Sequence, residues 1–201
     1  SDIPRTEYNW EFSVYRGARE EIPKDGPEPL GKPVVTATYV DANLYHSMLT
    51  GKSVSEVLHL FNKTPVDWYA KKQGTSETAT YGSEYVAART ATEQIIDNRL
   101  SLRYLGVPVR ESFMFGDNES VVNSSNIPAG KLHKRHIALS WHRVRESIAA
   151  KILYFIHIPG AINPSDMLSK QWGYQQTWTQ LQALLFWQGD TTDLLRDEKS
   201  T

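Results

Sequence analysis

Four acidic side chains of this chain stand where an apolar run stops or a helix is expected to begin. A carboxylate beside an apolar core is costly to desolvate when it is isolated, whereas a cluster of carboxylates is the ligand set that hard divalent cations prefer. The four predict metal-dependent chemistry on phosphate groups. They are Asp41 in Tyr-Val-Asp-Ala-Asn, Glu84 in Gly-Ser-Glu-Tyr, Asp117 in Phe-Gly-Asp-Asn and Asp166 in Asn-Pro-Ser-Asp.

The composition fits one soluble globular domain with extensions. Hydrophobic residues make up 40% of the 201 residues, and no apolar stretch approaches the roughly 20 residues of a membrane span. The formal net charge is -1, so a polyanionic partner requires a local basic patch. The absence of cysteine excludes disulfides and thiolate nucleophiles. The start of the chain lacks a signal-peptide pattern. Because it also lacks an initiator Met, we expect a fragment of a longer protein.

Shifts in pattern divide the chain into three segments. Residues 1–33 read as an arm and linker, in which the alternation from Tyr8 to Val14 predicts a short strand before a stretch rich in Pro and Gly. Residues 34–172 carry the periodic apolar pattern of one α/β domain. Residues 173–201 predict an amphipathic helix followed by a charged, frayed tail.

Three strands are expected at the start of the domain. The first runs from Val34 to Val40 and is followed at once by Asp41. The next two run from Val54 to Phe61 and from Val66 to Tyr69, separated by the turn sequence Asn-Lys-Thr-Pro. Together they predict an antiparallel meander.

Helices and two further strands follow. A long helix is expected after the Ser- and Thr-rich stretch from Thr75 to Thr80, which offers side chains to cap it. Glu84 lies on the apolar stripe of that helix and should face the sheet. The remaining expected elements are a strand at Phe113–Phe115, a short helix through Val121 and Val122, a helix over Lys131–Lys151, a strand over Ile152–Ile158, and a helix start with Asn163 as its cap and Asp166 in its first turn.

This order of elements predicts an α/β fold: a mixed five-stranded sheet, with three antiparallel strands and then parallel ones, flanked by helices. Asp41 and Asp117 each follow a strand, while Glu84 and Asp166 belong to helices that pack near the same edge. We therefore expect the four acids to converge on a single pocket.

Six segments, in this order, resemble the RNase H domain of copia-type (LTR) retrotransposon polyproteins. The resemblance implies an RNase H-like fold and an endonuclease that hydrolyses the RNA strand of RNA/DNA hybrids. It further implies that the four acids are the catalytic residues and the ligands of two Mg²⁺ ions, with Mn²⁺ as a substitute. The segments are Tyr-Val-Asp41-Ala, Val-Asp-Trp-Tyr-Ala-Lys-Lys-Gln, Thr-Tyr-Gly-Ser-Glu84-Tyr-Val-Ala, Gly-Asp117-Asn-Glu-Ser, Lys-Arg-His136-Ile and Asn-Pro-Ser-Asp166-Met-Leu-Ser-Lys.

The same resemblance implies partners and a setting. An adjoining reverse transcriptase of the same polyprotein would be the protein partner, an RNA/DNA hybrid the substrate, and no membrane would be involved. The expected location is intracellular, in the cytoplasm or in virus-like particles, with the nucleus as an alternative.

Several polar and basic residues are predicted to hold the nucleic acid. A basic run near the helix expected at Lys131–Lys151, which includes Arg145, would contact phosphates without reading bases. His157 is a candidate for proton transfer, with a packed strand histidine as the alternative. The predicted nucleic-acid-binding residues are Asn43, Lys71, Lys72, Lys134, Arg135, His136 and Arg143, with Gln73 beside the two strand lysines.

Two other functions stay open at this stage. One is a non-catalytic RNase H-like connector or nucleic-acid-binding module, since the presence of four acids does not establish their geometry. The other is an integrase-like enzyme that processes DNA, because one fold hosts several phosphoryl chemistries. Taken singly, Asp166 also suits a helix start and Asp117 a turn.

Overall fold

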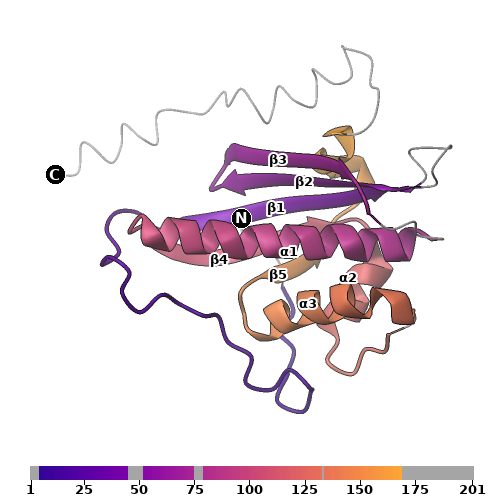
Figure 1. The fold of residues 1–201 in the computed structure, drawn as a ribbon, viewed down its shortest axis with the longest axis horizontal. Helices are drawn as coiled ribbons and strands as arrows, with labels where there is room; N and C mark the ends of the chain where they lie inside the picture. The colour runs from indigo at the N-terminus through magenta and orange to yellow at the C-terminus, as the bar shows by residue number, and fades with distance from the viewer. Residues whose placement is uncertain (1–4, 45–51, 75–78, 133, 169–201) are drawn as a thin grey trace. The chain divides into compact units, whose positions relative to one another are not determined.

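The structure is a computed structural model that describes residues 5–44, 52–74, 79–132 and 134–168. One mixed five-stranded sheet lies at the centre of the described domain (Figure 1). The strand order is β3-β2-β1-β4-β5. β1 pairs antiparallel with β2, and β2 with β3, whereas β1–β4 and β4–β5 are parallel. The predicted mixed sheet is confirmed. The strands are β1 (Val34–Asn43), β2 (Val54–Phe61), β3 (Thr64–Lys72), β4 (Val109–Gly116) and β5 (Tyr154–His157).

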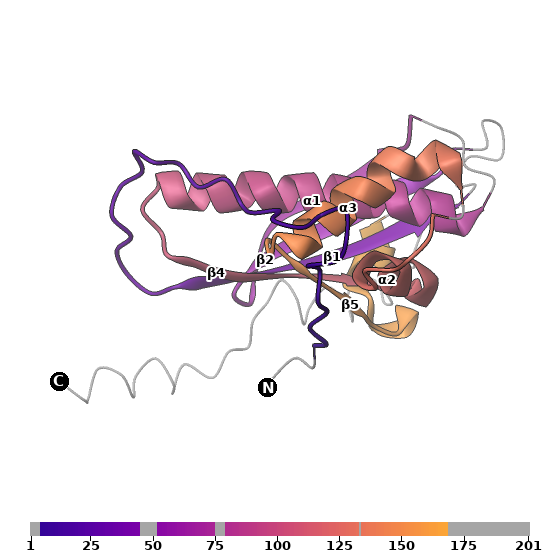
Figure 2. The same ribbon diagram turned by 90° about the horizontal axis from the view of Figure 1, so that it is seen from below.

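Helices α1 and α3 lie on one side of this sheet, as Figure 2 shows. The predicted stripe of α1 is buried: Ala88, Ala91 and Ile95 belong to the same core cluster as Val57 and Met114 of the sheet. None of the described helices combines the length and the apolar character that a membrane span requires. The helices are α1 (Thr80–Tyr104), α2 (Glu119–Asn126) and α3 (Ala138–Ala149), with three short 3₁₀ turns, η1 (Arg135–Ile137), η2 (Gly160–Ile162) and η3 (Pro164–Leu168).

One predicted helix start and one predicted helix cap were wrong. The helix expected from Lys131 begins as α3 at Ala138, after the turn η1, because only from Ile137 onward does every third or fourth residue face the core. α1 begins at Thr80, as expected, but its N-cap residue is Ala79, which makes no side-chain capping hydrogen bond. The buried side chain of Gln73, which follows β3, instead donates a hydrogen bond to the first turn of α1.

The amino-terminal arm contains no strand between residues 5 and 33, in contrast to the prediction for Tyr8–Val14. The segment turns on itself, with Ser13 N–H donating to the carbonyl of Trp10. Of the alternating residues, Trp10 lies against the guanidinium of Arg145, as does the neighbouring Tyr15, whereas Phe12 and Val14 are exposed. Alternation alone therefore did not produce a strand here, because Phe12 and Val14 are not covered by the core.

Farther along, the arm follows α1 toward its carboxyl end before entering β1 (Figure 2). Both carboxylate oxygens of Glu20 accept hydrogen bonds from Arg99 and Arg103 of α1, at 2.6 to 2.8 Å. Leu30 N–H then donates to the carbonyl of Gly106 at 2.8 Å. The arm is thus fixed to the helical layer at two places. The amphipathic helix predicted for residues 173–201 lies outside the described residues.

Candidate metal centre

Two of the four acids reach the same edge of the sheet because β1 and β4 are parallel neighbours. Val40 lies opposite Gly116 in the register, so the next residues lie side by side: Asp41, which is still within β1, and Asp117, which follows β4. The loop after β5 closes against Asp117: a Cβ placed on Gly160 would lie 2.8 Å from its Oδ2. Only glycine therefore fits at this position without displacing the carboxylate.

Glu84 enters from the first turns of α1, which Gln73 anchors to the sheet. Gln73 follows β3, is buried, and donates through Nε2 to the carbonyl of Ser83 at 2.8 Å and to Ser55 Oγ of β2 at 2.9 Å. Gln73 was expected beside Lys71 and Lys72 among the residues that hold nucleic acid, and that prediction was wrong because its side chain is buried. Its side chain joins the meander to the helix that carries Glu84.

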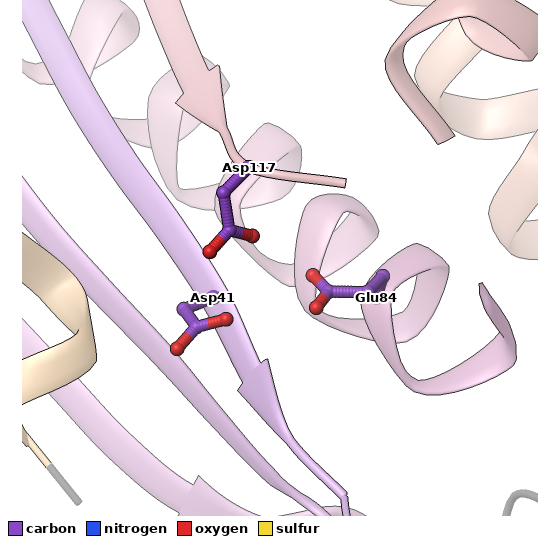
Figure 3. A group of neighbouring side chains, drawn as sticks. All are labelled: Asp41, Glu84 and Asp117. Atoms are coloured by element: carbon purple, nitrogen blue, oxygen red, sulfur yellow. The ribbon is translucent and has the colours of Figure 1, made fainter. Parts of the chain in front are cut away.

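The carboxylates of Asp41, Glu84 and Asp117 converge, as Figure 3 shows. One oxygen from each lies within 4.8 Å of the other two. Asp41 and Glu84 are buried, and Asp117 is half-buried. Three like charges from a strand end, a helix and a second strand end are thus brought together.

Asp166 lies in η3, which Asn163 ties to β1. Asn163 Nδ2 donates to the carbonyl of Val40 at 3.0 Å, and its Oδ1 accepts from Ser165 Oγ at 2.7 Å. The expected polar cap before Asp166 is therefore present, although the element is a 3₁₀ turn. Because Val40 precedes Asp41, this contact holds η3 beside the acid of β1.

A fifth acid, Glu56 of β2, was missed by the sequence analysis. It lies directly opposite Asp41 in the β1–β2 register, and oxygens of Asp41, Glu56 and Asp166 form a second group within 4.8 Å of one another. The side chain is fully buried. The local sequence provides little signal, because the run Val54–Phe61 also contains the polar residues Ser55 and His59.

The like charges alter the titration of these acids. Burial, the negative charge of Asp117, and a hydrogen bond and charge from Asp166 raise the pKa of Asp41 to about 7, partly offset by the N–H of Ala42. Burial and the charges of Asp41 and Asp117 raise the pKa of Glu84 well above its ordinary value. The folded protein thus disfavours the charged form of both groups, which is the condition a bound cation relieves.

An open depression of about 420 Å³ exposes part of this cluster. It is lined by Asp41, Asp117 and Asp166 together with Asn43 and Gly160, among others. The donors are all carboxylate oxygens, which fits a hard divalent cation such as Mg²⁺ or Mn²⁺. The depression is open enough to admit a phosphate group beside such a cation.

The two strand lysines lie at the acid end of the sheet. Lys72 is opposite Val54, which is opposite Asn43, so this row crosses three strands at the level just beyond Asp41. Neighbouring strands lie about 4.8 Å apart, which places the backbone of Lys72 roughly 10 Å from that of Asn43. Lys71 and Lys72 are both exposed.

The predicted basic residues near α3 do not line the depression that holds the acids. Lys134 is half-buried, Arg135 and His136 are exposed in or beside η1, and Arg143 donates to Glu146 at 3.4 Å. Their contact with nucleic acid stays a prediction. Arg145 is different, because it is 1% exposed and donates to carbonyls in and just after the last turn of α2, so its place in a surface patch was wrong.

His157 ends β5 next to the acids. The ring is exposed, and its Nε2 lies 3.1 Å from the carbonyl oxygen of Asp117. The alternative of a histidine packed inside the strand is therefore wrong. A role in proton transfer stays a prediction, because the contact is to backbone and not to a carboxylate.

Comparisons with known proteins agree with this architecture. No protein-family model matches the chain. Over 140 residues, 70% of the chain, it is 26% identical to the retrovirus-related Pol polyprotein from transposon TNT 1-94 of Nicotiana tabacum, and it spans about 10% of that polyprotein's length.

Two solved structures share the fold. LC11-RNase H1 isolated from compost aligns with 69% of this chain and 93% of its own, at a TM-score of 0.51 and 18% identity. The N-terminal RNase H domain of a Mycobacterium tuberculosis protein aligns with 75% of this chain and 98% of its own, at a TM-score of 0.52 and 13% identity. The chain therefore has the RNase H-like fold and is similar in sequence to part of a retrotransposon Pol polyprotein, which confirms the resemblance drawn from its sequence.

Proposed function

We propose that this protein is a metal-dependent endonuclease that hydrolyses the RNA strand of RNA/DNA hybrids. The observation that carries the proposal is the meeting of Asp41, Glu84 and Asp117 within 4.8 Å at the end of two parallel strands, with Asp166 grouped on the same Asp41. The RNase H-like fold and the similarity to a Pol polyprotein support the choice of substrate.

The carboxylates would hold two Mg²⁺ ions, for which Mn²⁺ would substitute. Asp41 belongs to both carboxylate groups and would contribute to both sites; Glu84 and Asp117 would hold one ion, and Asp166 the other. Cations held there would lower the pKa of the attacking water and offset the negative charge that builds on the phosphate. Gly160 and Asn163 act indirectly, because they fix the positions of Asp117 and Asp166.

Asn43, Lys71 and Lys72 are proposed to hold the hybrid beside this centre. Asn43 lines the depression and the lysines lie in the same end of the sheet, so phosphates that follow the scissile bond would meet positive charge. The amide of Asn43 is suited to a ribose 2′-hydroxyl, the group that distinguishes RNA from DNA.

An adjoining reverse transcriptase is the proposed protein partner. The chain spans about one tenth of the Pol polyprotein that it resembles, so other domains of such a polyprotein would act on the same nucleic acid. Tethering raises the effective concentration of the hybrid at the nuclease site. Fusion to the polymerase should therefore raise hybrid affinity.

The direct test is cleavage of labelled RNA/DNA, DNA/DNA and RNA/RNA duplexes in Mg²⁺, Mn²⁺ or EDTA. Wild type should cut the hybrid alone and only with metal. Asp117→Asn should lower the rate by on the order of 10³-fold or more, because it removes a carboxylate from the centre without changing its shape. Asp97→Asn, an exposed position of α1, is the matched control and should cut at the wild-type rate.

Other patterns of binding and cleavage would favour other functions. Hybrid binding without cleavage under any metal condition would contradict the enzyme and favour a binding module. Cleavage of DNA/DNA in preference to the hybrid would favour a DNA-processing enzyme. Equal cleavage rates for wild type and Asp117→Asn would mean that the acidic cluster takes no part in the reaction.

A further inference from the structure

Glu56 occupies a position where an ordinary sheet core would place an apolar side chain. It lies in the middle of β2, between Ser55 and Val57, and has no exposed surface. Residues directly opposite in an antiparallel pair project from the same face of the sheet. Because Glu56 is opposite Asp41, the two carboxylates leave the same face at the acid end.

The geometry around Glu56 repeats that of the first carboxylate group. Its oxygen, one of Asp41 and one of Asp166 all lie within 4.8 Å of one another. Ligand oxygens that surround one Mg²⁺ at about 2.1 Å are separated by up to about 4.2 Å, and those around the larger Ca²⁺ by up to about 5 Å. The group therefore closes on a cation with small side-chain adjustments.

The two groups share Asp41 and no other residue: Glu84 and Asp117 complete one, and Glu56 and Asp166 the other. A carboxylate common to two groups is the arrangement of a two-metal site, whose ions lie about 3.5 to 4 Å apart. Without Glu56, the group on the η3 side would consist of Asp41 and Asp166 alone.

We infer that Glu56 is a fifth carboxylate of the metal centre and holds the cation on the side of Asp166. This inference rests on the proposed function, since it assigns a ligand to the centre described there. The carboxylate acts from the interior of the sheet, because Glu56 is fully buried while Asp166 is half-exposed and lines the depression. The outer side of the cation is then left open to water and to a phosphate oxygen.

The position of Glu56 among other carboxylates also predicts how its charge affects the stability of the metal-free protein. Carboxylates packed together without a cation repel one another, and burial strengthens that repulsion. Replacing Glu56 by the isosteric Gln removes one of these charges and keeps the shape. The metal-free protein should become more stable, while its response to metal becomes weaker.

The test compares Glu56→Gln with wild type, without nucleic acid and therefore without reference to activity. Thermal melting is measured in EDTA and across a Mn²⁺ titration, and calorimetry gives the number of Mn²⁺ bound. Glu56→Gln should melt at a higher temperature than wild type in EDTA. Its weaker Mn²⁺ site should lose at least about tenfold in affinity, the loss typical even of groups that only support a ligand.

Two further variants separate ligation from folding. Glu146→Gln, exposed on α3, is the matched control and should bind Mn²⁺ as wild type does. Glu56→Asp keeps the charge on a side chain one methylene shorter, so its Mn²⁺ affinity should fall between those of wild type and Glu56→Gln. This variant also carries the test if the Gln protein does not fold.

The outcomes distinguish this inference from the proposed function. If wild type binds Mn²⁺ and Asp117→Asn weakens it, but Glu56→Gln leaves affinity and stoichiometry unchanged, the assignment of Glu56 is overturned and the metal centre stands. If Glu56→Gln melts lower in EDTA with an unchanged Mn²⁺ response, Glu56 is structural and the assignment is overturned. If wild type binds no Mn²⁺, the proposed metal centre fails with it.

Discussion

Two regions of this molecule bury carboxylates, and they do so with opposite consequences. Where the arm meets α1, Glu20 lies between Arg99 and Arg103; burial alone would raise its pKa, but hydrogen bonds and charge from the two arginines lower it to about 2. At the acid end of the sheet, Asp41 lies among carboxylates, and its pKa rises to about 7. The arm contact stabilises the fold, whereas the acid cluster weakens the metal-free protein at neutral pH.

The difference indicates how the fold tolerates such a site. Arg145 donates to three carbonyls in and just after the last turn of α2, at 2.6 to 2.7 Å, and its guanidinium lies over the rings of Trp10 and Trp141. These contacts, like those of Glu20, lie in the arm and helical layer and not among the acids. Opposite charges and hydrogen bonds to backbone carbonyls there offset the repulsion among the acids of the candidate metal centre.

The largest expected effect on the free energy of unfolding comes from replacing Arg145. Arg145→Ala would leave buried carbonyls unsatisfied and detach the aromatic residues of the arm, so it should lower the free energy of unfolding by roughly 3 kcal/mol or more. Urea denaturation measures it. Arg143→Ala, two residues away with only a long contact to Glu146, is the control and should change stability by less than about 0.5 kcal/mol. Similar losses in both variants would mean that the arm contact does not stabilise the fold.

A smaller loss is expected for Glu20→Gln, which keeps the shape and removes the charge between the two arginines. The free energy of unfolding at pH 7 should fall by about 2 to 3 kcal/mol. The folded pKa of Glu20 is lowered, so its contribution is present above about pH 4.5 and is lost as the pH falls toward 2. Denaturation at pH 7 and at pH 3 should show the gap between wild type and variant narrowing; a gap independent of pH would contradict this account.

Removing a charge from the acid cluster should raise the free energy of unfolding, by less than Glu20→Gln lowers it. The folded pKa of Asp41 is raised, so its contribution is favourable below its ordinary value of 3.8 and is lost as the pH rises through about 7. In EDTA at pH 8, Asp41→Asn should therefore be more stable than wild type by about 1 to 2 kcal/mol, with the gap closing near pH 4. Mg²⁺ should stabilise wild type more than the variant. A less stable variant at pH 8 would contradict the account.

The sheet could be predicted from the sequence because local patterns determine it. The boundaries of β2 matched Val54–Phe61, and the stripe of α1 identified the face that is buried, since both follow from alternation or helical periodicity. The start of α3 could not be predicted in the same way. Charged residues before Ile137 fit a helix and a loop equally well, and only core contact separates the two.

The site was only partly predictable for a related reason. Asp41 lies near the end of β1 and Asp117 follows β4, so their convergence depends on a parallel pairing that the order of elements implies. Glu56 has no such signal: it is brought to Asp41 by the register between β1 and β2, which no local pattern reveals. Arg145 and Gln73 likewise looked like surface residues, because a sequence does not show which polar side chains satisfy buried backbone groups.

The most direct test of the central claim is to locate the cations themselves. Crystals of the protein soaked in Mn²⁺ should give two anomalous difference peaks, one bounded by Asp41, Glu84 and Asp117, and the other beside Asp41 and Asp166. Absence of any peak in contact with Asp41, in crystals where Mn²⁺ is at saturating concentration, would contradict the account.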